Sequence, residues 1–441
     1  MDINLTTLNE ILDENINMFV AGNGFSINFD KGFYNIYDNL DKAHKNVIHK
    51  TKYEIKSGNA FKKKYYDNLD AVMRYIRFYK KKDIEKIFED GIKFSSSIVE
   101  NEELLALFNK NDVLTSLTFG MSELDILKEL QYAGSKKGYK YVNIEYWTIL
   151  VYFYYVIKDL PVDGIYKFPE NNSFLTLVKL GDSSNIKLME TKDTKSYAMT
   201  ETISNGFSIY YRLLFINAAF NNGKAIDVTK LDNYNVINKG KLKEFLSKFH
   251  SLATLNYDNI LESIIGKDVV HLHGKFNIET KSYVYNQSIQ ILYKDLMIDA
   301  SDIIIGDYFI YKTLIPVINK LSASQSSNKN NINKEVEYIG DILKNEIKKY
   351  AVNSISLFGI NVINDYHILR NIMIELYFAY SEGIIRNPQI VYFYHSEKSK
   401  KIFESTFDRI ITFSDKLNDF VRDIIDIYFV STKEVLDEYF F

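Results

Sequence analysis

The chain has 441 residues, of which 46% are hydrophobic and 25% charged, as in a soluble globular protein of two or three domains or one large elaborated domain. Its formal net charge of −3 and its excess of lysine over arginine disfavour nucleic acid as a partner, because bidentate recognition of bases and phosphates mostly uses arginine. Cysteine is absent, which excludes disulfides, thiolate nucleophiles and cysteine-based metal centres.

The N-terminal segment predicts no signal peptide, because it is acidic and amphipathic and has no basic start followed by an apolar core. The most apolar window, residues 146–157, is too short to span a bilayer and favours a buried helix. We therefore expect a cytoplasmic protein without membrane contact.

The first predicted elements are a helix over residues 1–15 and a compact apolar strand over 18–21. The strand runs directly into Gly22-Asn23-Gly24-Phe25-Ser26. Such a turn permits positive φ and lets backbone N–H groups approach a phosphate or a ribose. It is not a complete GxGxxG fingerprint, and a plain tight turn is the commoner explanation of this pattern taken alone.

Residues 61–240 predict a large, mainly helical insertion. Apolar residues recur at helical spacing over 35–110, and 140–160 and 207–221 are typical of buried helices. The run Lys62–Tyr66 favours a solvated helix face with core tyrosines over a nucleic-acid patch, given the nearly neutral total charge. Two shorter stretches, 173–180 and 185–193, suggest a small hairpin or irregular loop.

The stretch 249–276 predicts strand, helix, strand, with strands at 252–255 and 269–272 around a helix at 257–265. Asn256 and Asp258 follow the first strand, and His273 and Gly274 follow the second. Both strand ends should point the same way, because the right-handed βαβ unit returns the chain to the same edge of the sheet. An amide, a carboxylate and an imidazole should therefore line one crevice.

The C-terminal part continues the alternation. Residues 301–306 are a strand or a helix start, 321–334 form a Ser/Asn-rich mobile loop, and 335–350 form a helix. A buried strand at 354–358 then runs into Gly359-Ile360-Asn361, with Asp365 near the start of the next helix. Further strands are predicted at 389–394, followed by His395, and at 427–430.

This alternation predicts an α/β fold, a Rossmann-like doubly wound parallel sheet with a large, mainly helical insertion. Ligands of such sheets bind at the carboxyl ends of the strands, where three polar or glycine-rich loops should meet. The predicted domain organisation is a sheet domain formed by 1–60, 241–320 and 335–441, interrupted by the helical insertion 61–240 and the mobile loop 321–334.

The ordered motifs GNGFS, TLNYDN, HLHG and FGIN…D resemble the sirtuin-like superfamily, above all its bacterial antiphage-defence members and abortive-infection proteins with GNGF and HIHG-like motifs. Sirtuins carry a Gly-Ala-Gly-x-Ser loop, an Asn-x-Asp after a strand and a His-Gly after the next one. The matching order here is Gly22–Ser26, Asn256-Tyr257-Asp258 and His273-Gly274. The resemblance covers roughly 15–34, 250–276 and 351–396.

The resemblance implies that Gly22, Asn23, Gly24, Phe25 and Ser26 surround the phosphates and ribose of NAD. It further implies that Asn256 holds the ribose and the attacking water, that Asp258 fixes the loop or touches the nicotinamide side, and that His273 is the general base. Gly359 and Asn361 would bind the second ribose, with Asp365 shaping that loop. Cleaving the nicotinamide–ribose bond passes through an oxocarbenium-like state, which requires orientation and a base with a pKa near neutral.

Two departures from the family pattern bear on activity. The zinc-binding cysteines of protein-deacylating sirtuins are missing, which favours NAD hydrolysis over peptide deacylation. Asn361 also stands where a Ser or Thr commonly follows the late Gly.

Each candidate histidine has a structural alternative. An isolated His273 would more often be a buried residue bonded to backbone, but its position after a strand and before Gly favours catalysis. His271 lies two residues earlier on the same predicted strand face, and we expect no metal site because no third ligand has convincing spacing. His395 either reaches the cleft or caps a strand.

The leading hypothesis is an NAD⁺ glycohydrolase with NAD as substrate, no metal, and a role as an abortive-infection effector in antiphage defence. Because constant NAD⁺ loss would be lethal, we expect a homo-oligomer that is held inactive until a companion defence protein or a phage-derived trigger acts, with the helical insertion as the place for oligomer contacts or the trigger. The alternatives are a catalytically silent NAD or ADP-ribose sensor that signals through a partner protein, and a nuclease-like or nucleic-acid-binding effector using the lysine-rich helices.

Overall fold

The computed structural model describes residues 1–49, 53–57, 62–114, 122–182, 194–277, 287–293, 296–300, 339–411 and 415–441. The predicted element at 301–306, the loop at 321–334 and the stretch 185–193 lie outside these residues. Within them, no helix is both long and apolar enough to cross a membrane.

The chain forms two compact units. Unit 1 consists of Met1–Tyr34, Asn222–Phe276 and Val336–Phe441, and unit 2 of Asn35–Asn221 and Asn277–Glu335. These bounds differ from the predicted insertion 61–240 at both of its ends. Unit 2 also takes a later segment, because β2 (Tyr53–Ser57) pairs antiparallel with β6 (Gln287–Tyr293).

Unit 1 is built on a six-stranded sheet with the order β10-β9-β8-β1-β3-β4. All neighbouring pairs are parallel, and central β1 pairs with β3 on one side and with β8 on the other. Numbered along the chain within this sheet, the order is 3-2-1-4-5-6, that of the doubly wound dinucleotide-binding fold. The predicted Rossmann-like α/β fold is confirmed. The strands are β1 Asn17–Ala21, β3 Ser251–Thr254, β4 Val270–His271, β8 Ser354–Phe358, β9 Gln389–Tyr394 and β10 Asp426–Ser431.

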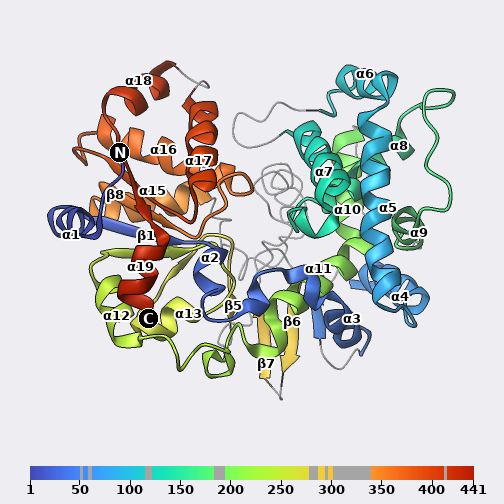
Figure 1. Ribbon diagram of the computed structural model, residues 1–441. Helices are drawn as coiled ribbons and strands as arrows, with labels where there is room; N and C mark the ends of the chain where they lie inside the picture. Colours follow the sequence, from blue (N-terminus) through green and yellow to red (C-terminus); the bar gives the residue numbers. More distant parts are fainter. Residues whose placement is uncertain are drawn as a thin grey trace, which may run out of the picture. The chain divides into compact units, whose positions relative to one another are not determined.

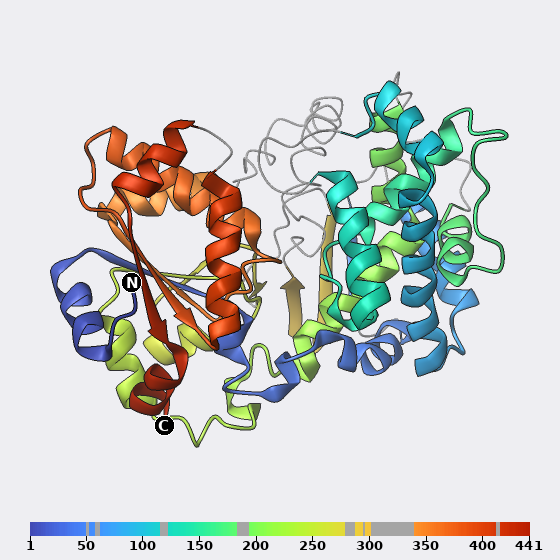
Figure 2. The same cartoon turned by 45° about the horizontal axis from the view of Figure 1, so that its top comes forward.

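The strands alternate their side chains between two helical layers, as a period of two residues requires. Met18 and Val20 of β1 and Leu357 of β8 pack on one face, in an aliphatic core shared with four helices. Phe19 and Phe358 belong to the other face, where their ring centroids lie 5.9 Å apart. Figures 1 and 2 show the helices that cover the two faces of this sheet. The four helices of the aliphatic face are α15 Ile339–Tyr350, α16 Tyr366–Ser381, α17 Glu397–Ile411 and α18 Asp415–Asp423.

The second face has an aromatic core. Phe19 contacts Phe245 and Phe249 at ring-centroid distances of 6.2 and 5.0 Å, and Phe358 stacks on Phe440 at 5.8 Å. Each fully buried phenylalanine contributes roughly 1.5–3 kcal/mol, so this cluster holds the C-terminus firmly on the sheet. The helical elements here are α2 Asn23–Ser26, α12 Lys239–Ser247, α13 Ile260–Ile265, α19 Thr432–Val435 and a π-turn over Leu436–Phe440.

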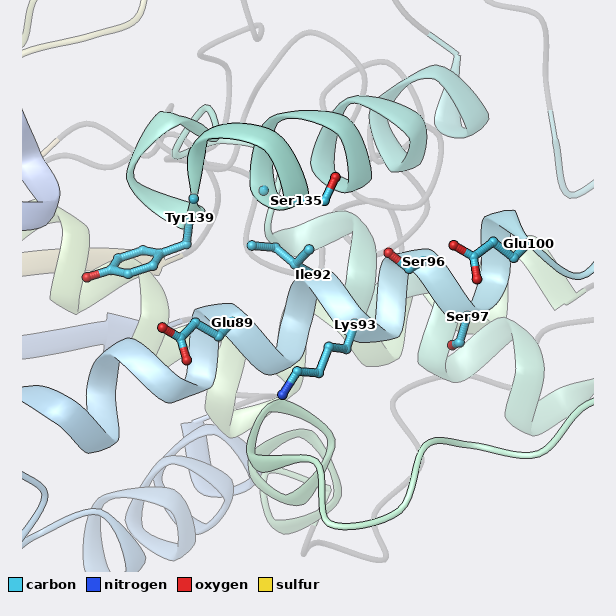
Figure 3. Close-up of a pocket in the computed structure, with 10 residues that line it drawn as sticks. Glu89, Ile92, Lys93, Ser96, Ser97, Glu100, Ser135 and Tyr139 are labelled. Atoms are coloured by element: carbon cyan, nitrogen blue, oxygen red, sulfur yellow. The ribbon is translucent and has the colours of Figure 1, made fainter.

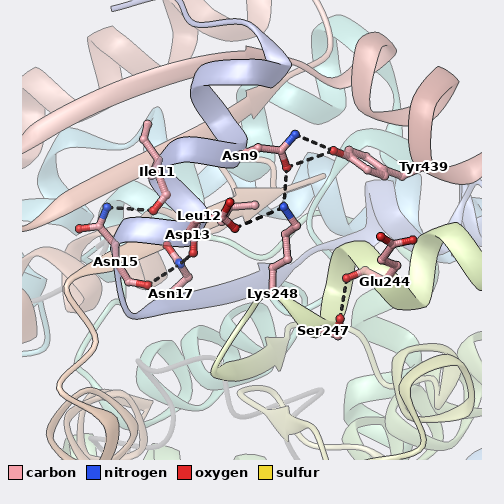
Figure 4. A network of polar contacts seen from close by, with 10 residues as sticks. All are labelled: Asn9, Ile11, Leu12, Asp13, Asn15, Asn17, Glu244, Ser247, Lys248 and Tyr439. Carbon is pink, nitrogen blue, oxygen red and sulfur yellow. Dashed lines mark hydrogen bonds and ion pairs between the residues drawn. The ribbon is translucent and has the colours of Figure 1, made fainter.

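A polar network closes the rim of this layer (Figure 4). Lys248 donates to Asn9 of α1 (Leu5–Glu14) at 2.9 Å and pairs with Asp13 at 3.4 Å, while Asn9 also bonds Tyr439 at 3.1 Å. Asn17 donates to the carbonyl oxygens of Leu12 and Asn15. These contacts fix α1 against the first strand and the C-terminal turn.

Unit 2 is mainly helical in its described part, around two helices whose residues are almost all buried. These helices are α8 (Thr148–Asp159) and α11 (Gly206–Phe220), as predicted from their apolar runs. Trp147, the single tryptophan, donates its Nε1–H to the hydroxyl of Tyr37 at 2.6 Å. A four-stranded sheet runs in the order β2-β6-β7-β5, with β7 Leu296–Ala300 and β5 Phe276–Asn277. The other helices are α3 Leu40–Ile48, α4 Lys62–Tyr75, α5 Lys81–Val99, α6 Glu102–Lys110, α7 Glu123–Lys137, α9 Ser173–Leu180 and α10 Thr194–Ser204.

The prediction of a hairpin or loop at 173–180 is wrong, because this stretch is helix α9. Asn172 caps the helix by accepting a hydrogen bond from the N–H of Leu175 at 2.9 Å. Asp90 of α5 accepts from the N–H of Ser173 at 2.8 Å, and Phe174 is fully buried. Burial on most sides leaves α9 with a nearly continuous apolar sequence, which hides the helical period.

Candidate functional site

The predicted site residues of unit 1 follow strands of one parallel sheet, so their loops lie at the same edge. Residues 22–26 follow β1, 256–258 follow β3, and 359–365 follow β8. Because β3 and β8 flank β1, these loops surround the point where the strand order reverses, which is where doubly wound folds bind ligands.

The Gly22–Ser26 turn packs backbone to backbone on the loop after β8. A Cβ at Gly22 would lie 2.6 Å from the carbonyl oxygen of Gly359, and one at Gly24 would lie 2.6 Å from the Cα of Gly359. Gly359 itself has φ of +66°. All three positions therefore require glycine for close packing.

The N–H groups of this turn are largely used inside the protein. Gly22 donates to Phe358 at 2.8 Å, Gly24 donates to Gly359 at 2.9 Å, and Phe25 donates to Gly22 at 2.9 Å. Phe25 is 1% exposed, so its ring belongs to the aromatic core. Asn23 is exposed and its side chain donates to the carbonyl oxygen of Phe33 at 2.8 Å. The turn thus offers a ligand fewer N–H donors than its glycine pattern predicts.

A hydrogen-bonded relay joins the loop after β1 to the loop after β3. Asn256 donates its two amide hydrogens to the carbonyl oxygen of Gly22 at 2.9 Å and to the Oγ of Ser26 at 2.8 Å. Ser26 in turn donates to Oδ2 of Asp258 at 2.7 Å. With both amide hydrogens donated, the side-chain oxygen of Asn256 is the atom that remains for a ligand.

Asp258 is a buried carboxyl with a shifted pKa. Burial raises its pKa to about 6, against the lowering effect of hydrogen bonds from Ser26 and from the N–H of Ile260. The cause is desolvation, which disfavours the charged form of a carboxyl group. Asp258 therefore changes charge near neutral pH, at the end of the relay that holds Asn256.

The structure adds Glu262, which the sequence does not single out. His271 bonds the backbone oxygen of Asn256 through Nδ1 at 2.8 Å and Oε1 of Glu262 through Nε2 at 2.6 Å. Glu262 lies on α13, and it belongs to the site only through its contact with His271, nine residues later. The sequence signal for this pair is the HLHG motif, which by itself indicates His271 only as a possible metal ligand. Among the described residues, no group of three His, Asp or Glu side chains is arranged to hold a metal ion.

His273 is buried in the turn after β4, with 6% of its surface exposed. The expectation that His271 and His273 share a strand face is wrong, because β4 ends at His271. Gly274, with φ of +87°, turns the chain, and Phe276 donates to the carbonyl oxygen of Tyr257 at 3.1 Å. This bond ties the His273 turn to the Asn256–Asp258 loop.

Asn361 and Asp365 bond to their own loop. The side chain of Asn361 accepts from the N–H of Ile363 at 3.2 Å, and its carbonyl oxygen accepts from the N–H of Asp365 at 2.8 Å. The two residues thus shape the entry into α16. His395 is exposed at the end of β9.

Unit 2 carries a separate hollow of about 560 Å³ between α5 and α7 (Figure 3). Most of its polar side chains bond within the protein: Lys93 pairs with Asp90 at 2.9 Å, and Glu100 accepts from Gln131 at 2.8 Å. The two helices approach each other closely at Gly134, where a Cβ would lie 2.4 Å from Ile92. Because its polar side chains are mostly bonded within the protein, the lining of the hollow presents few groups to a ligand.

Comparison with known protein families, with curated proteins and with solved structures found no match for this chain.

Proposed function

We propose that this protein is an NAD⁺ glycohydrolase, which converts NAD⁺ and water to ADP-ribose, nicotinamide and a proton. The observation that carries the proposal is the convergence of the Gly22–Ser26, Asn256–Asp258 and Gly359 loops at the switch point of a 3-2-1-4-5-6 sheet. A dinucleotide is the ligand that this position in this fold favours.

Asn256 is suited to orient the reacting ribose. Its amide hydrogens are held by Gly22 and Ser26, so its Oδ1 accepts from a ribose hydroxyl or from the attacking water. A rigid acceptor supports hydrolysis by orientation, since positioning alone lowers a barrier by several kcal/mol.

His273 is the proposed general base. It follows β4 at the same edge, and its turn is bonded to the Asn256 loop. An imidazole takes up a proton near neutral pH, as removal of a proton from water or a ribose hydroxyl requires. Asp258 and Ser26 act through Asn256 as positioning residues.

The test is NAD⁺ loss with appearance of ADP-ribose, by purified protein and on expression in cells. Wild type should consume NAD⁺, and His273→Ala and Asn256→Ala should lose the activity. His395→Ala is the matched control, an exposed histidine that follows β9 of the same sheet, and should retain the activity. Equal activity in wild type and His273→Ala would contradict the assignment of the base.

The silent-sensor hypothesis is separated by NAD binding measured by thermal shift. Binding without turnover, even with candidate triggers present, would favour a sensor that signals through a partner. If the protein neither binds NAD nor hydrolyses it, both hypotheses are overturned. A defence role with oligomer formation and an external trigger belongs to the proposal and is tested by NAD⁺ levels in infected cells.

A further inference from the structure

His271 is held by acceptors on both sides of its ring. Nδ1 lies 2.8 Å from the backbone oxygen of Asn256 and Nε2 lies 2.6 Å from Oε1 of Glu262. The side chain of His271 is 4% exposed and that of Glu262 is 18% exposed. The ring is thus clamped between the Asn256–Asp258 loop and helix α13.

The chemistry of these atoms decides where the protons lie. A carbonyl oxygen accepts hydrogen bonds but never donates them, so Nδ1 carries a hydrogen. The short contact between Nε2 and Oε1 then requires one shared proton, on the ring as an imidazolium or on the carboxyl group. Either arrangement fixes the Nδ1–H form of the ring, as a carboxylate partner does for histidines elsewhere.

The groups around the pair carry both signs of charge. Lys275 lies 3.8 Å from Oε1 of Glu262, and Asp258 interacts electrostatically with both His271 and Glu262. Oε2 of Glu262 is buried and accepts no hydrogen bond from the described residues. Lys275 is therefore a cation beside the carboxyl group that shares its proton with His271.

The clamp acts on the residue that matters most for the proposed reaction. The backbone oxygen of Asn256 accepts from His271, its N–H donates to Oγ1 of Thr254 at 3.0 Å, and its side chain donates to Gly22 and Ser26. Asn256 is thereby fixed on both sides of its Cα. Removing the His271 contact frees the carbonyl and the peptide plane that follows it.

We propose that His271 and Glu262 form a proton-sharing pair that positions Asn256, with His271 donating to its backbone oxygen and Glu262 holding the ring in the donating form. Both are positioning residues, because they act through Asn256. The effect on turnover rests on the proposed NAD⁺ hydrolysis, whereas the state of the ring does not.

The first measurement is nitrogen NMR of protein with labelled histidine, which is independent of activity. We expect Nδ1 of His271 to carry a hydrogen that is protected from solvent exchange. The signal should disappear in His271→Asn, which assigns it, and should move in Glu262→Gln, where a neutral amide faces Nε2. An unprotonated Nδ1, or exchange as fast as at exposed His395, would overturn the proposal whether or not the protein hydrolyses NAD⁺.

The second measurement uses rescue. An asparagine amide occupies nearly the position of Nδ1–H in histidine, so His271→Asn keeps the donor to Asn256, whereas His271→Ala and His271→Leu remove it. We expect kcat to fall on the order of 10- to 100-fold in His271→Ala, as for a small misplacement of a reacting group, with KM nearly unchanged. His271→Asn should recover most of kcat.

Glu262→Gln tests the shared proton. It should keep much of kcat but alter the pH profile, because the proton can no longer move between the partners. Lys275→Met is the control for charge near Glu262 and should change kcat by less than about threefold, since a partly exposed ion pair at 3.8 Å contributes little. Equal loss in His271→Ala and His271→Asn, with unchanged folding by circular dichroism, would overturn the positioning role. Absence of turnover in wild type would count against the hydrolase, and the NMR result would still decide the pair.

Discussion

Replacing Ser26 by alanine removes the middle of the relay between Asn256 and Asp258. Ser26 is fully buried, accepts from Asn256 at 2.8 Å and donates to Asp258 at 2.7 Å. The change leaves one amide hydrogen of Asn256 and one oxygen of Asp258 without their partner. Leaving a buried polar group unpaired costs roughly 1–3 kcal/mol, and more when the group is charged.

The size of the effect depends on pH because Asp258 has a raised pKa of about 6, against an ordinary value of 3.8. Between these values the folded state binds more protons than the unfolded state, so stability falls as pH rises through this window. A shift of this size corresponds to roughly 3 kcal/mol, at 1.36 kcal/mol per pKa unit. The hydrogen bond from Ser26 lowers the pKa of Asp258, so its loss raises this pKa further. The decline in stability then extends to higher pH.

We therefore expect Ser26→Ala to destabilise unit 1 by roughly 1 kcal/mol at pH 5, where Asp258 is neutral, and by roughly 2–3 kcal/mol at pH 8, where it is charged. The assay is hydrogen exchange in peptides from β1 and β3, corrected for the intrinsic pH dependence of exchange. Trp147 fluorescence is unsuitable here because this tryptophan belongs to unit 2. Ser263→Ala is the control, since the hydroxyl of exposed Ser263 on α13 donates to the carbonyl oxygen of Asn259 one turn earlier, and should change stability by less than about 0.5 kcal/mol. The same loss at pH 5 and pH 8 would refute the role of charged Asp258.

Two further predictions concern backbone packing and unit 2. Gly24→Ala should destabilise unit 1 by roughly 2 kcal/mol or more, because its Cβ would lie 2.6 Å from the Cα of Gly359. Gly240→Ala, in α12 with its nearest neighbour at 3.5 Å, should be neutral or stabilise by up to about 1 kcal/mol; similar melting curves for the two variants would contradict this. Burial raises the pKa of Asp90, but hydrogen bonds from Lys86, Lys93 and Ser173 outweigh burial and lower it to about 2, so its stabilisation is present above pH 4 and is lost as pH falls through 2. Asp90→Asn should lower the free energy of unfolding by about 1–2 kcal/mol at pH 7 and by much less near pH 2. The fluorescence of Trp147 monitors this unfolding. A loss of stability that is the same at both pH values would exclude the ionic contribution.

The sequence predicts the sheet strands well because parallel strands buried on both faces are short, continuous apolar runs. The strand expected at 354–358 matches β8 residue for residue, and the one expected at 389–394 matches β9. The same property defeats the prediction at α9, because a helix buried on most sides has no polar stripe to reveal its period.

What the sequence by itself determined is the set of strands in the parallel sheet, the helical character of the insertion and the polar residues that end several of these strands, since these depend on local patterns. The strands of the second sheet, β2, β5, β6 and β7, were not among its predictions. Only the tertiary structure decided that β1 lies between β3 and β8, that Gly24 packs on Gly359, and that His271 meets Glu262. These facts depend on the pairing of segments up to hundreds of residues apart, and no local preference encodes which buried strand lies beside which. The Asn256–Ser26–Asp258 relay arises in the same way, because its three residues meet only after β1 and β3 pair in register.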